Sequence, residues 1–345
     1  MSADLAGGPV LVTAVGGAPG FDLTRMLLHD GYDIIAADAN CYAAGLFLPA
    51  VTPVVIPPSH DDRYPDELLR ICRSERPAAL IATDEGEILR LLELGEELTT
   101  LGVRTWLPFR EAVAACHDKA AFHRTAREHD IPVPRTWLPG ELDRIPAKLE
   151  LVVKPRRGHG AKDVLFCHSV QQAQVLCELV DDPIVQERID GAEFTADCLV
   201  DRDGNVSVIP RRRLRVRNGL AMVAATFHDD QVAETVTATL AALEMTGLCC
   251  VQGFITDGPD RVVITEVNTR IAGAFPVSVA AGADLIGEFL NGLFGKPVDH
   301  DRLRFTGGVH LVKYVETLAA GPVPLAAARP LTSPVPVTVP VGGNR

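Results

Sequence analysis

Short apolar runs alternate with amphipathic segments along the first hundred residues. The expected strands are Pro9–Ala14, Tyr32–Asp38 and Ala78–Thr83. The expected helices, with apolar positions at helical spacing, are Phe21–Asp30, Asp66–Ser74 and Ile88–Leu98. Strands that alternate with helices are typical of a parallel sheet covered by its crossover connections. The first part of the chain is therefore predicted to be an α/β domain.

The pattern changes after a predicted helix at His117–His129, which Pro132 and Pro134 bring to an end. Strands then follow one another through short turns, as in a mainly antiparallel α+β fold. These strands are Leu149–Pro155, Asp163–Cys167, Ile184–Arg188, Glu193–Asp201, Val206–Val216, Cys249–Asp257 and Arg261–Asn268. Helices are expected at Val170–Leu179, Gln231–Thr246 and Leu285–Leu293. This change of style places a domain boundary near residues 105–115.

Composition narrows the class of protein. A chain of 345 residues is long enough for two or three domains. The net charge of −12 argues against nucleic acid as a partner, because phosphates would be repelled. No apolar stretch is long enough for a membrane helix, and the first residues do not resemble a signal peptide. The eight cysteines form no CxxC pair. We therefore expect a cytoplasmic protein with reduced thiols and no membrane partner.

A glycine-rich turn, Gly16–Gly20, follows the first strand, and Asp38 ends the second strand. This order is similar to a dinucleotide fingerprint, but the spacing is not GxGxxG. A common glycine turn is the preferred interpretation. The start of the following helix could still hold an anion such as a substrate carboxylate.

The strongest chemical signal is the expected hairpin around Gly258-Pro259-Asp260. If those three residues are the loop, Asp257 pairs with Arg261, and Gln252 then faces Glu266. Asn268 joins them on the same face because side chains two apart along a strand point the same way. Oxygen ligands with little charge suit Mg²⁺, which takes its remaining ligands from water and phosphate. Arg270, just beyond, could stabilise charge on a phosphoryl group in transfer.

A second signal is Lys154, which ends an apolar strand before the loop Arg156-Arg157-Gly158-His159-Gly160-Ala161-Lys162. The loop is not a Walker A motif, which precedes a helix. A glycine-rich loop between two strands can close over phosphates with its backbone N–H groups. Gly158 and Gly160 are therefore candidates for nucleotide binding.

Together these segments resemble the ATP-grasp family, over residues of about 10–315. The resemblance rests on Cys250-Val251-Gln252-Gly253-Phe254, on Thr265-Glu266-Val267-Asn268-Thr269-Arg270, and on the lysine with its loop, and it points to the branch of the carbamoyl phosphate synthetase large subunit. It implies that Gln252, Glu266 and Asn268 bind two Mg²⁺ or Mn²⁺ ions between the phosphates of ATP. His159 and Ala161 depart from the small hydroxyl residues usual in the loop.

The resemblance also implies the remaining contacts to ATP. Lys119 and Lys154 match lysines that lie near the phosphates. The backbone of Glu187, Arg188 and Ile189 matches the hinge beside adenine. Glu193 matches the carboxylate that binds the ribose hydroxyls, a chemistry that suits two donors.

The strand at Pro210–Arg217 carries Arg211, Arg213, Arg215 and Arg217, which alternation would place on one face. A solvated edge would explain them, but within an acidic chain some use in anion binding is favoured. Arg211 and Arg213 are the preferred ligands of a substrate carboxylate or acyl phosphate, with Arg215 as a further candidate. Gly273 lies in a loop of small residues that a ligand can approach. Asp84 or Glu87 could hold a substrate ammonium group, although acids at a helix start explain them equally well.

The sequence thus predicts an α/β protein with the ATP-grasp fold. The expected divisions are a Rossmann-like pre-ATP-grasp domain (1–110), a small subdomain with the glycine-rich loop (111–187), a large subdomain with the metal site (188–320) and an extended tail (321–345). The expected activity is ATP-dependent ligation of a small carboxylate, such as an amino acid, to an amine through an acyl phosphate. The alternatives are carboxylation or carbamoyl-phosphate-type activation of bicarbonate, ATP binding without chemistry, and a dinucleotide oxidoreductase. A homodimer is left open.

Overall fold

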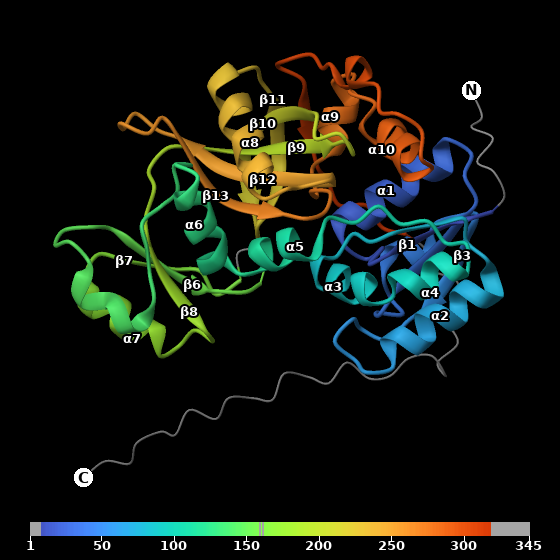
Figure 1. The fold of residues 1–345 in the computed structure, drawn as a ribbon, viewed down its shortest axis with the longest axis horizontal. Helices are drawn as coiled ribbons and strands as arrows, with labels where there is room; N and C mark the ends of the chain where they lie inside the picture. The colour runs from blue at the N-terminus through green and yellow to red at the C-terminus, as the bar shows by residue number, and fades with distance from the viewer. Residues whose placement is uncertain (1–7, 159, 161, 319–345) are drawn as a thin grey trace, which may run out of the picture.

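The computed structural model describes residues 8–158, 160 and 162–318. The predicted tail, 321–345, lies outside these residues, as do His159 and Ala161. Within them the chain forms a four-stranded, a six-stranded and a second four-stranded sheet, with helices packed between and around them (Figure 1). This mixture of parallel and antiparallel sheets confirms the predicted α/β class and fits the ATP-grasp fold.

The first sheet is parallel and has the strand order β3-β2-β1-β4. Its strands are β1 (Val10–Thr13), β2 (Ile34–Asp38), β3 (Val51–Val55) and β4 (Ala79–Ile81). Its helices are α1 (Ala18–His29), α2 (Tyr64–Glu75), α3 (Glu85–Glu93) and α4 (Gly95–Thr100). The sequence did not predict β3, because Pro53 interrupts it and its side chains are half-buried or exposed. The strand forms because it lies at a sheet edge, where proline needs no ladder partner.

The second four-stranded sheet is antiparallel, in the order β5-β8-β6-β7. It contains β5 (Thr136–Trp137), β6 (Leu151–Pro155), β7 (Leu165–Cys167) and β8 (Pro183–Glu187). The helix α7 (Val170–Cys177) packs on this sheet, whereas α5 (Arg110–His117) and α6 (Lys119–Glu128) share a hydrophobic core with the six-stranded sheet. The single helix expected at His117–His129 is preceded by α5, and Asp118 separates the two.

The six-stranded sheet has the order β13-β12-β9-β10-β11-β14. Its strands are β9 (Ala192–Val200), β10 (Val206–Arg217), β11 (Leu220–Thr226), β12 (Gly247–Ile255), β13 (Val262–Asn268) and β14 (His310–Val312). The helices that pack on it are α8 (Asp230–Ala242), α9 (Pro276–Ala280) and α10 (Leu285–Leu293). The elements β11, α9 and β14 were not predicted. β8 and β9, on either side of the expected boundary at 187 and 188, belong to different sheets.

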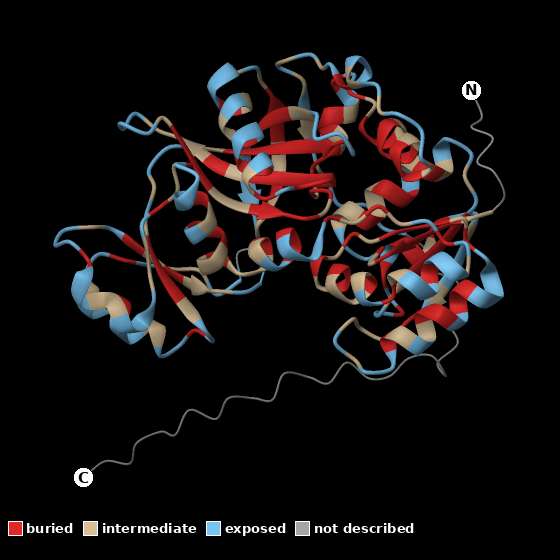
Figure 2. Ribbon diagram, viewed as in Figure 1, coloured by how far each residue is buried: buried red, intermediate tan, exposed pale blue. Residues whose placement is uncertain are grey.

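One hydrophobic core joins the parallel sheet to the six-stranded sheet. It combines Val10 and Val12 of β1 with Leu199 and Leu248 of the larger sheet and with Phe289 of α10. Figure 1 shows α10 beside α1, and Figure 2 shows the strands of both sheets largely buried. Shared burial of this kind fixes the relative position of the two layers, because separating them would expose apolar surface to water.

Trp106 is the anchor of this shared core. Its ring stacks on Phe289 with centroids 5.5 Å apart and an interplanar angle of 3°. The indole Nε1 donates to Thr246 Oγ1 at 3.0 Å, so the polar end of the ring is also satisfied. Gly292 of α10 leaves room for the ring, since a Cβ there would lie 2.0 Å from Trp106 Cζ3.

We therefore expect Gly292→Ala to destabilise the fold by about 1–3 kcal/mol through overpacking, although alanine is the better helix former. Thermal or urea unfolding of the variant measures this. Gly95→Ala is the matched control, because a Cβ at Gly95 meets no atom within 4 Å. Equal stability of the two variants would contradict the assigned contact.

Candidate nucleotide and metal site

The hairpin of β12 and β13 forms, but with a different loop from the expected one. The Thr256 N–H donates to the Arg261 carbonyl at 2.8 Å, and Ile255 pairs with Val262. The predicted pairing of Asp257 with Arg261 was therefore wrong by one residue. Further along, a bulge at Thr265 restores the offset, so Gln252 does face Glu266 as predicted.

Glycine makes this bulge possible. A Cβ at Gly253, beside the bulge, would lie 2.4 Å from the Val263 carbonyl oxygen and 2.9 Å from the Phe194 ring. No side chain larger than hydrogen fits that approach. The glycine therefore allows the local shift that brings Gln252 and Glu266 opposite one another.

Glu266, Asn268 and Arg270 are held together at the end of β13. The Asn268 Nδ2 donates to Glu266 Oε1 at 3.1 Å, and Arg270 Nη2 donates to Asn268 Oδ1 at 3.3 Å. The second arm of the guanidinium, Nη1, donates to the Ile271 carbonyl at 3.0 Å. With Gln252, these three side chains line one cavity of about 1300 Å³. A space of that size exceeds an ordinary small-ligand pocket and suits a nucleotide with a second substrate.

The charges around Glu266 keep it ionised. Burial by itself raises the pKa of this carboxyl, but Lys154, Lys119, Asn268 and Arg270 outweigh that effect and hold the pKa below its usual value. Conversely, burial lowers the pKa of Lys154 to about 8, with Glu266 opposing the fall and Lys119 adding to it. The two lysines thus lie close enough to the carboxylate to influence its charge.

These residues fit a magnesium ion. Gln252, Glu266 and Asn268 offer one carboxylate and two amide oxygens toward a cavity open to phosphate and water, which is the partial ligand set that Mg²⁺ prefers. Among the described residues no group of three or more His, Cys, Asp or Glu side chains forms a metal cluster. The side-chain amide oxygens of Gln252 and Asn268 would therefore be needed, beside the Glu266 carboxylate, as the protein's ligands to the metal.

Lys119 begins α6 and binds the glycine-rich loop. Its Nζ donates to the Gly158 carbonyl at 2.6 Å, and its backbone N–H donates to the Arg156 carbonyl at 3.0 Å. Gly158 and Gly160 have φ values of +118° and +75°, a region that favours glycine. Lys119, Gly158, Gly160 and Lys154 line the cavity. The structure thus brings the predicted phosphate-binding residues together.

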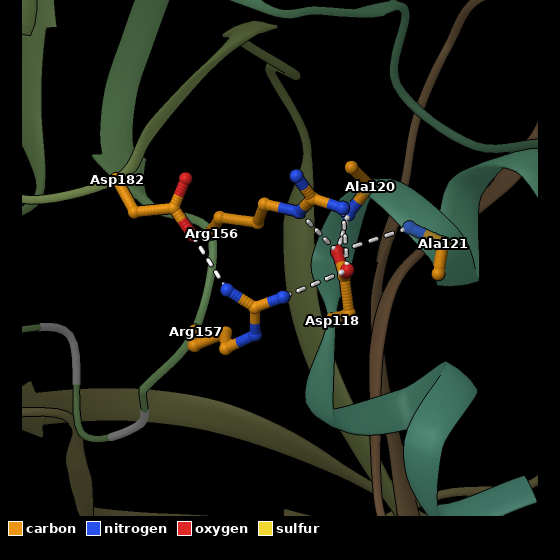
Figure 3. Close-up of polar contacts among 6 residues, drawn as sticks. All are labelled: Asp118, Ala120, Ala121, Arg156, Arg157 and Asp182. Carbon is orange, nitrogen blue, oxygen red and sulfur yellow. Dashed lines mark hydrogen bonds and ion pairs between the residues drawn. The ribbon is translucent and has the colours of Figure 1, made fainter.

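Asp118, which the sequence did not single out, fixes the root of this loop (Figure 3). Its carboxylate caps α6 by accepting from the N–H groups of Ala120 and Ala121, at 3.0 and 3.2 Å. The same carboxylate accepts two bonds from Arg156, at 2.7 and 2.6 Å. Arg157 lies 3.5 Å from Asp118 and 2.7 Å from Asp182. The signal in the sequence was the N-cap aspartate directly before Lys119.

The predicted hinge residues also line the cavity, but their side chains have other partners. Glu187 accepts two bonds from Arg135, and Arg188 donates to Glu150 at 2.8 Å. Ile189 and Glu193 follow along the same wall. The backbone N–H groups of Glu187 and Arg188 are also engaged, since they donate to the Arg135 and Glu150 carbonyls at 2.9 Å each, so these two residues could offer a base only their carbonyl groups.

The arginine row of β10 does not keep a common face. Register shifts against β11 on both sides of Arg215 break the alternation. Arg211 and Arg213 line the cavity, whereas Arg215 and Arg217 are exposed and are not among its lining residues within the described chain. The prediction of four arginines on one face is therefore wrong, and Arg215 loses its support as a substrate ligand.

Arg211 and Arg213 differ in their freedom. Arg211 is 1% exposed and donates to Asp197 at 2.9 and 3.2 Å, with Ser278 holding the same carboxylate at 2.6 Å. Its Nη1 has no hydrogen-bond partner among the described residues. Arg213 is already shared, with its Nε 3.0 Å from Glu193 and its Nη2 donating to the Gly219 carbonyl at 2.9 Å. Both arginines keep a buried donor without a hydrogen-bond partner among the described residues, Nη1 of Arg211 and Nε of Arg213, but that of Arg213 already lies beside the Glu193 carboxylate.

The first domain reaches the cavity at the start of α1. Ala18 and Pro19, at the start of α1, line it together with Gly273, where a Cβ would lie 2.7 Å from Leu220 Cδ1. Asp38 accepts from the N–H groups of Gly16 and Asn40, at 2.7 and 2.8 Å. The acid that a dinucleotide ribose would need is therefore used to hold the glycine turn.

The acidic segment after β4 contributes differently from expectation. Asp84 caps α3 by accepting from the Gly86 N–H. Glu87 is buried, accepts from the Thr13 and Tyr64 hydroxyls and is not among the described lining residues, so it does not face a substrate. Glu85, which was not predicted, accepts from the Thr269 N–H at 3.0 Å, next to Arg270.

Comparison with known proteins agrees with this geometry. Residues 116–274 match the family profile of the ATP-grasp domain. This segment, a little under half of the chain, is an ATP-grasp domain. The match runs from the end of α5 through Lys119, Lys154 and the β12–β13 hairpin to Ala274, and it leaves out β14 of the six-stranded sheet. No protein with a curated description shows significant similarity to the chain.

Solved ATP-grasp structures share the fold at low sequence identity. One of them is the biotin carboxylase domain dimer of the Hydrogenobacter thermophilus 2-oxoglutarate carboxylase, in complex with MgADP, ADP and bicarbonate. It is 14% identical to this chain with a TM-score of 0.70, and the alignment covers 87% of this chain and 73% of that chain. An L-amino acid ligase of Bacillus licheniformis is 18% identical (TM-score 0.65), covering 87% and 78%. Pyruvate carboxylase of Rhizobium etli is 16% identical (TM-score 0.69) over 88% of this chain, which spans only 30% of that protein.

Two expectations from composition can also be compared with the structure. All eight cysteines fall within the described residues and are free thiols, seven of them buried. None of the described helices combines the length and the apolar character that crossing a membrane requires.

Glu87 gives a pH dependence that tests its placement. Burial raises the pKa of this carboxyl to about 7 against the Thr13 and Tyr64 hydrogen bonds, so the folded state binds the proton more tightly than the unfolded chain. The protonated carboxyl therefore contributes about 3 kcal/mol to the free energy of unfolding below pH ~4.5. This contribution is lost as the pH rises through ~7. We expect Glu87→Gln to gain that much relative to wild type between pH 4.5 and 8 in unfolding experiments. A difference that does not change with pH would place Glu87 in solvent.

Proposed function

We propose that the protein is an ATP-dependent carboxylate–amine ligase that forms an amide or peptide bond and releases ADP and phosphate. The observation that carries the proposal is the buried Nη1 of Arg211, which has no hydrogen-bond partner among the described residues and belongs to a side chain that lines the same cavity as Glu266 and Asn268. A buried guanidinium donor without a partner is costly unless a ligand accepts from it. An anionic second substrate beside the phosphates meets that requirement.

The proposed arrangement of ATP follows from the cavity walls. The base lies along the backbone of Glu187, Arg188 and Ile189, and the ribose hydroxyls donate to Glu193. Lys119 and Lys154 neutralise phosphate charge, together with N–H groups of the loop that begins at Gly158. Bound Mg²⁺, or Mn²⁺, held by Gln252, Glu266 and Asn268, would supply further charge neutralisation on the phosphates.

The proposed chemistry needs no covalent nucleophile from the chain. Arg211 holds the substrate carboxylate, with Gly273 and the start of α1 close by, so that a carboxylate oxygen is directed at the γ-phosphorus. The bond from that phosphorus to the ADP oxygen breaks, which gives an acyl phosphate and ADP. Arg270 stabilises the charge on the phosphoryl oxygens during transfer. An amine then attacks the acyl carbon, and phosphate leaves as the amide forms.

The substrate class is tested by measuring ADP release. Amino acids, small carboxylic acids and bicarbonate are offered singly and in pairs with amines, and products are identified by mass. We expect ADP release only where a carboxylate and an amine are both present, and Glu266→Ala should reduce turnover by about 10²-fold or more. Bicarbonate-dependent turnover alone would establish carboxylation instead. ATP binding without any turnover would leave a non-catalytic role, and near-normal activity of Glu266→Ala would remove the metal assignment.

The role of Arg211 is tested by Arg211→Lys. Lysine keeps the positive charge beside Asp197 but loses the planar fork and the free Nη1. We expect the KM for the carboxylate to rise about tenfold or more, the loss expected for one charge-assisted hydrogen bond, while the KM for ATP changes less than about twofold. Arg215→Lys is the matched control on the exposed part of the same strand. Equal changes in both KM values would show that Arg211 only supports the fold.

A further inference from the structure

The end of β13 is tied to the first domain by a buried carboxylate. Glu85, in the first turn of α3, is 7% exposed and accepts from the Thr269 N–H at 3.0 Å. The Thr269 Oγ1 lies 3.4 Å from the same oxygen. The two residues are 184 positions apart in the chain, so this contact depends on how the domains pack.

Thr269 lies where the pairing of the hairpin stops. The last pair of the ladder between β12 and β13 joins Cys250 to Asn268. The next N–H, that of Thr269, is buried and has no strand beside it in the described ladder. A buried N–H without a partner is unfavourable, and Glu85 supplies the acceptor that the sheet no longer provides. The carboxylate therefore takes the place of a strand partner at this position.

The two neighbours of Thr269 are the groups that face the phosphates. Asn268 precedes it and donates to Glu266, while Arg270 follows it and donates back to Asn268. Fixing the peptide between them fixes the direction of both side chains. Arg270 also acts on Glu85 by charge, since it opposes the rise in the pKa of Glu85 that burial causes. The hydrogen bonds of Asn268 and Arg270, together with the Glu85 carboxylate on the Thr269 N–H, hold this corner in place.

We infer that Glu85 is a positioning residue, which holds Asn268 and Arg270 in register with the metal and the phosphates without touching either. It is not among the cavity's lining residues within the described chain. The inference rests on the proposed metal and nucleotide site. It makes the first domain a part of that site, and it separates Glu85 from Asp84 and Glu87, which serve the helix and the core.

Such a role affects metal-dependent binding selectively. The adenine, ribose and lysine contacts lie on other elements and do not pass through Thr269. Glu85→Gln keeps the size of the side chain and an oxygen acceptor but removes the charge. By calorimetry in EDTA, we expect ADP to bind this variant within about twofold of wild type. The Mg²⁺-dependent gain in affinity for adenylyl imidodiphosphate should fall about fivefold to tenfold, the difference expected between a charge-assisted and a neutral hydrogen bond.

Glu288→Gln is the matched control. Glu288 is a buried carboxylate of α10 that accepts from the Asp299 N–H at 2.8 Å and pairs with Arg302 at 3.2 Å. Its replacement removes the same kind of contact far from the corner. The control should lower the unfolding temperature but leave the Mg²⁺ response unchanged. If Glu85→Gln does not fold, Glu85→Asp, which keeps the charge but shortens the reach, gives the same readout.

The outcomes separate the possibilities. A Mg²⁺ response in the Glu85 variant equal to that of the control would overturn the positioning role. An equal loss in the affinity for ADP in EDTA and for adenylyl imidodiphosphate with Mg²⁺ would overturn it as well. Thr269→Ala, which keeps the backbone N–H, should change the Mg²⁺ response by less than about twofold, and a tenfold loss there would move the role to the hydroxyl. If wild-type protein binds neither nucleotide, the proposed function itself fails.

Discussion

The pairing of β12 with β13 is the constraint on which the candidate site depends. Its register decides which side chains face the cavity, because a slip of one residue turns every side chain to the other face. The bulge at Thr265 sets that register, and Gly253 permits it by leaving the Val263 carbonyl room to approach. The backbone conformation of Thr265 and Gly253, whose side chains have no role in the proposed chemistry, therefore places Gln252 opposite Glu266.

The cavity of this acidic protein is lined by lysines and arginines, and several of them are paired with carboxylates. Lys154 lies within the influence of Glu266, Arg211 is held by Asp197, and Arg213 by Glu193. Each pairing places a cation in a buried or half-buried position that it could not occupy alone. The −12 net charge repels large polyanions while these local fields remain able to attract a small one. The net charge of the protein thus acts on large polyanions at long range, whereas the cations of the cavity act on a small anion at short range.

Local patterns predicted those parts of the fold that are decided locally. The apolar runs of β1, β2 and β4, the helix at Leu285–Leu293 and the facing pair Gln252–Glu266 could all be predicted. The pair was predicted through two compensating errors, a loop offset and an unseen bulge. β3 and β14 were missed because edge strands need little hydrophobic alternation. The row of arginines failed for a related reason, since nothing in Arg211–Arg217 announces the irregular pairing with β11.

Glu85 shows why the remaining site residues could not be predicted. Next to Asp84 and Glu87 it is one of three acids at a helix start, a composition that capping and the helix dipole explain without any site. Its partner is a backbone N–H, which has no identity in the sequence, 184 positions away. Only the packing of α3 against the end of β13 distinguishes it from its neighbours. The first domain therefore joins the candidate site through a contact to the main chain. Its glycine turn, held by Asp38, leads directly into Ala18 and Pro19, which line the wall of the same cavity.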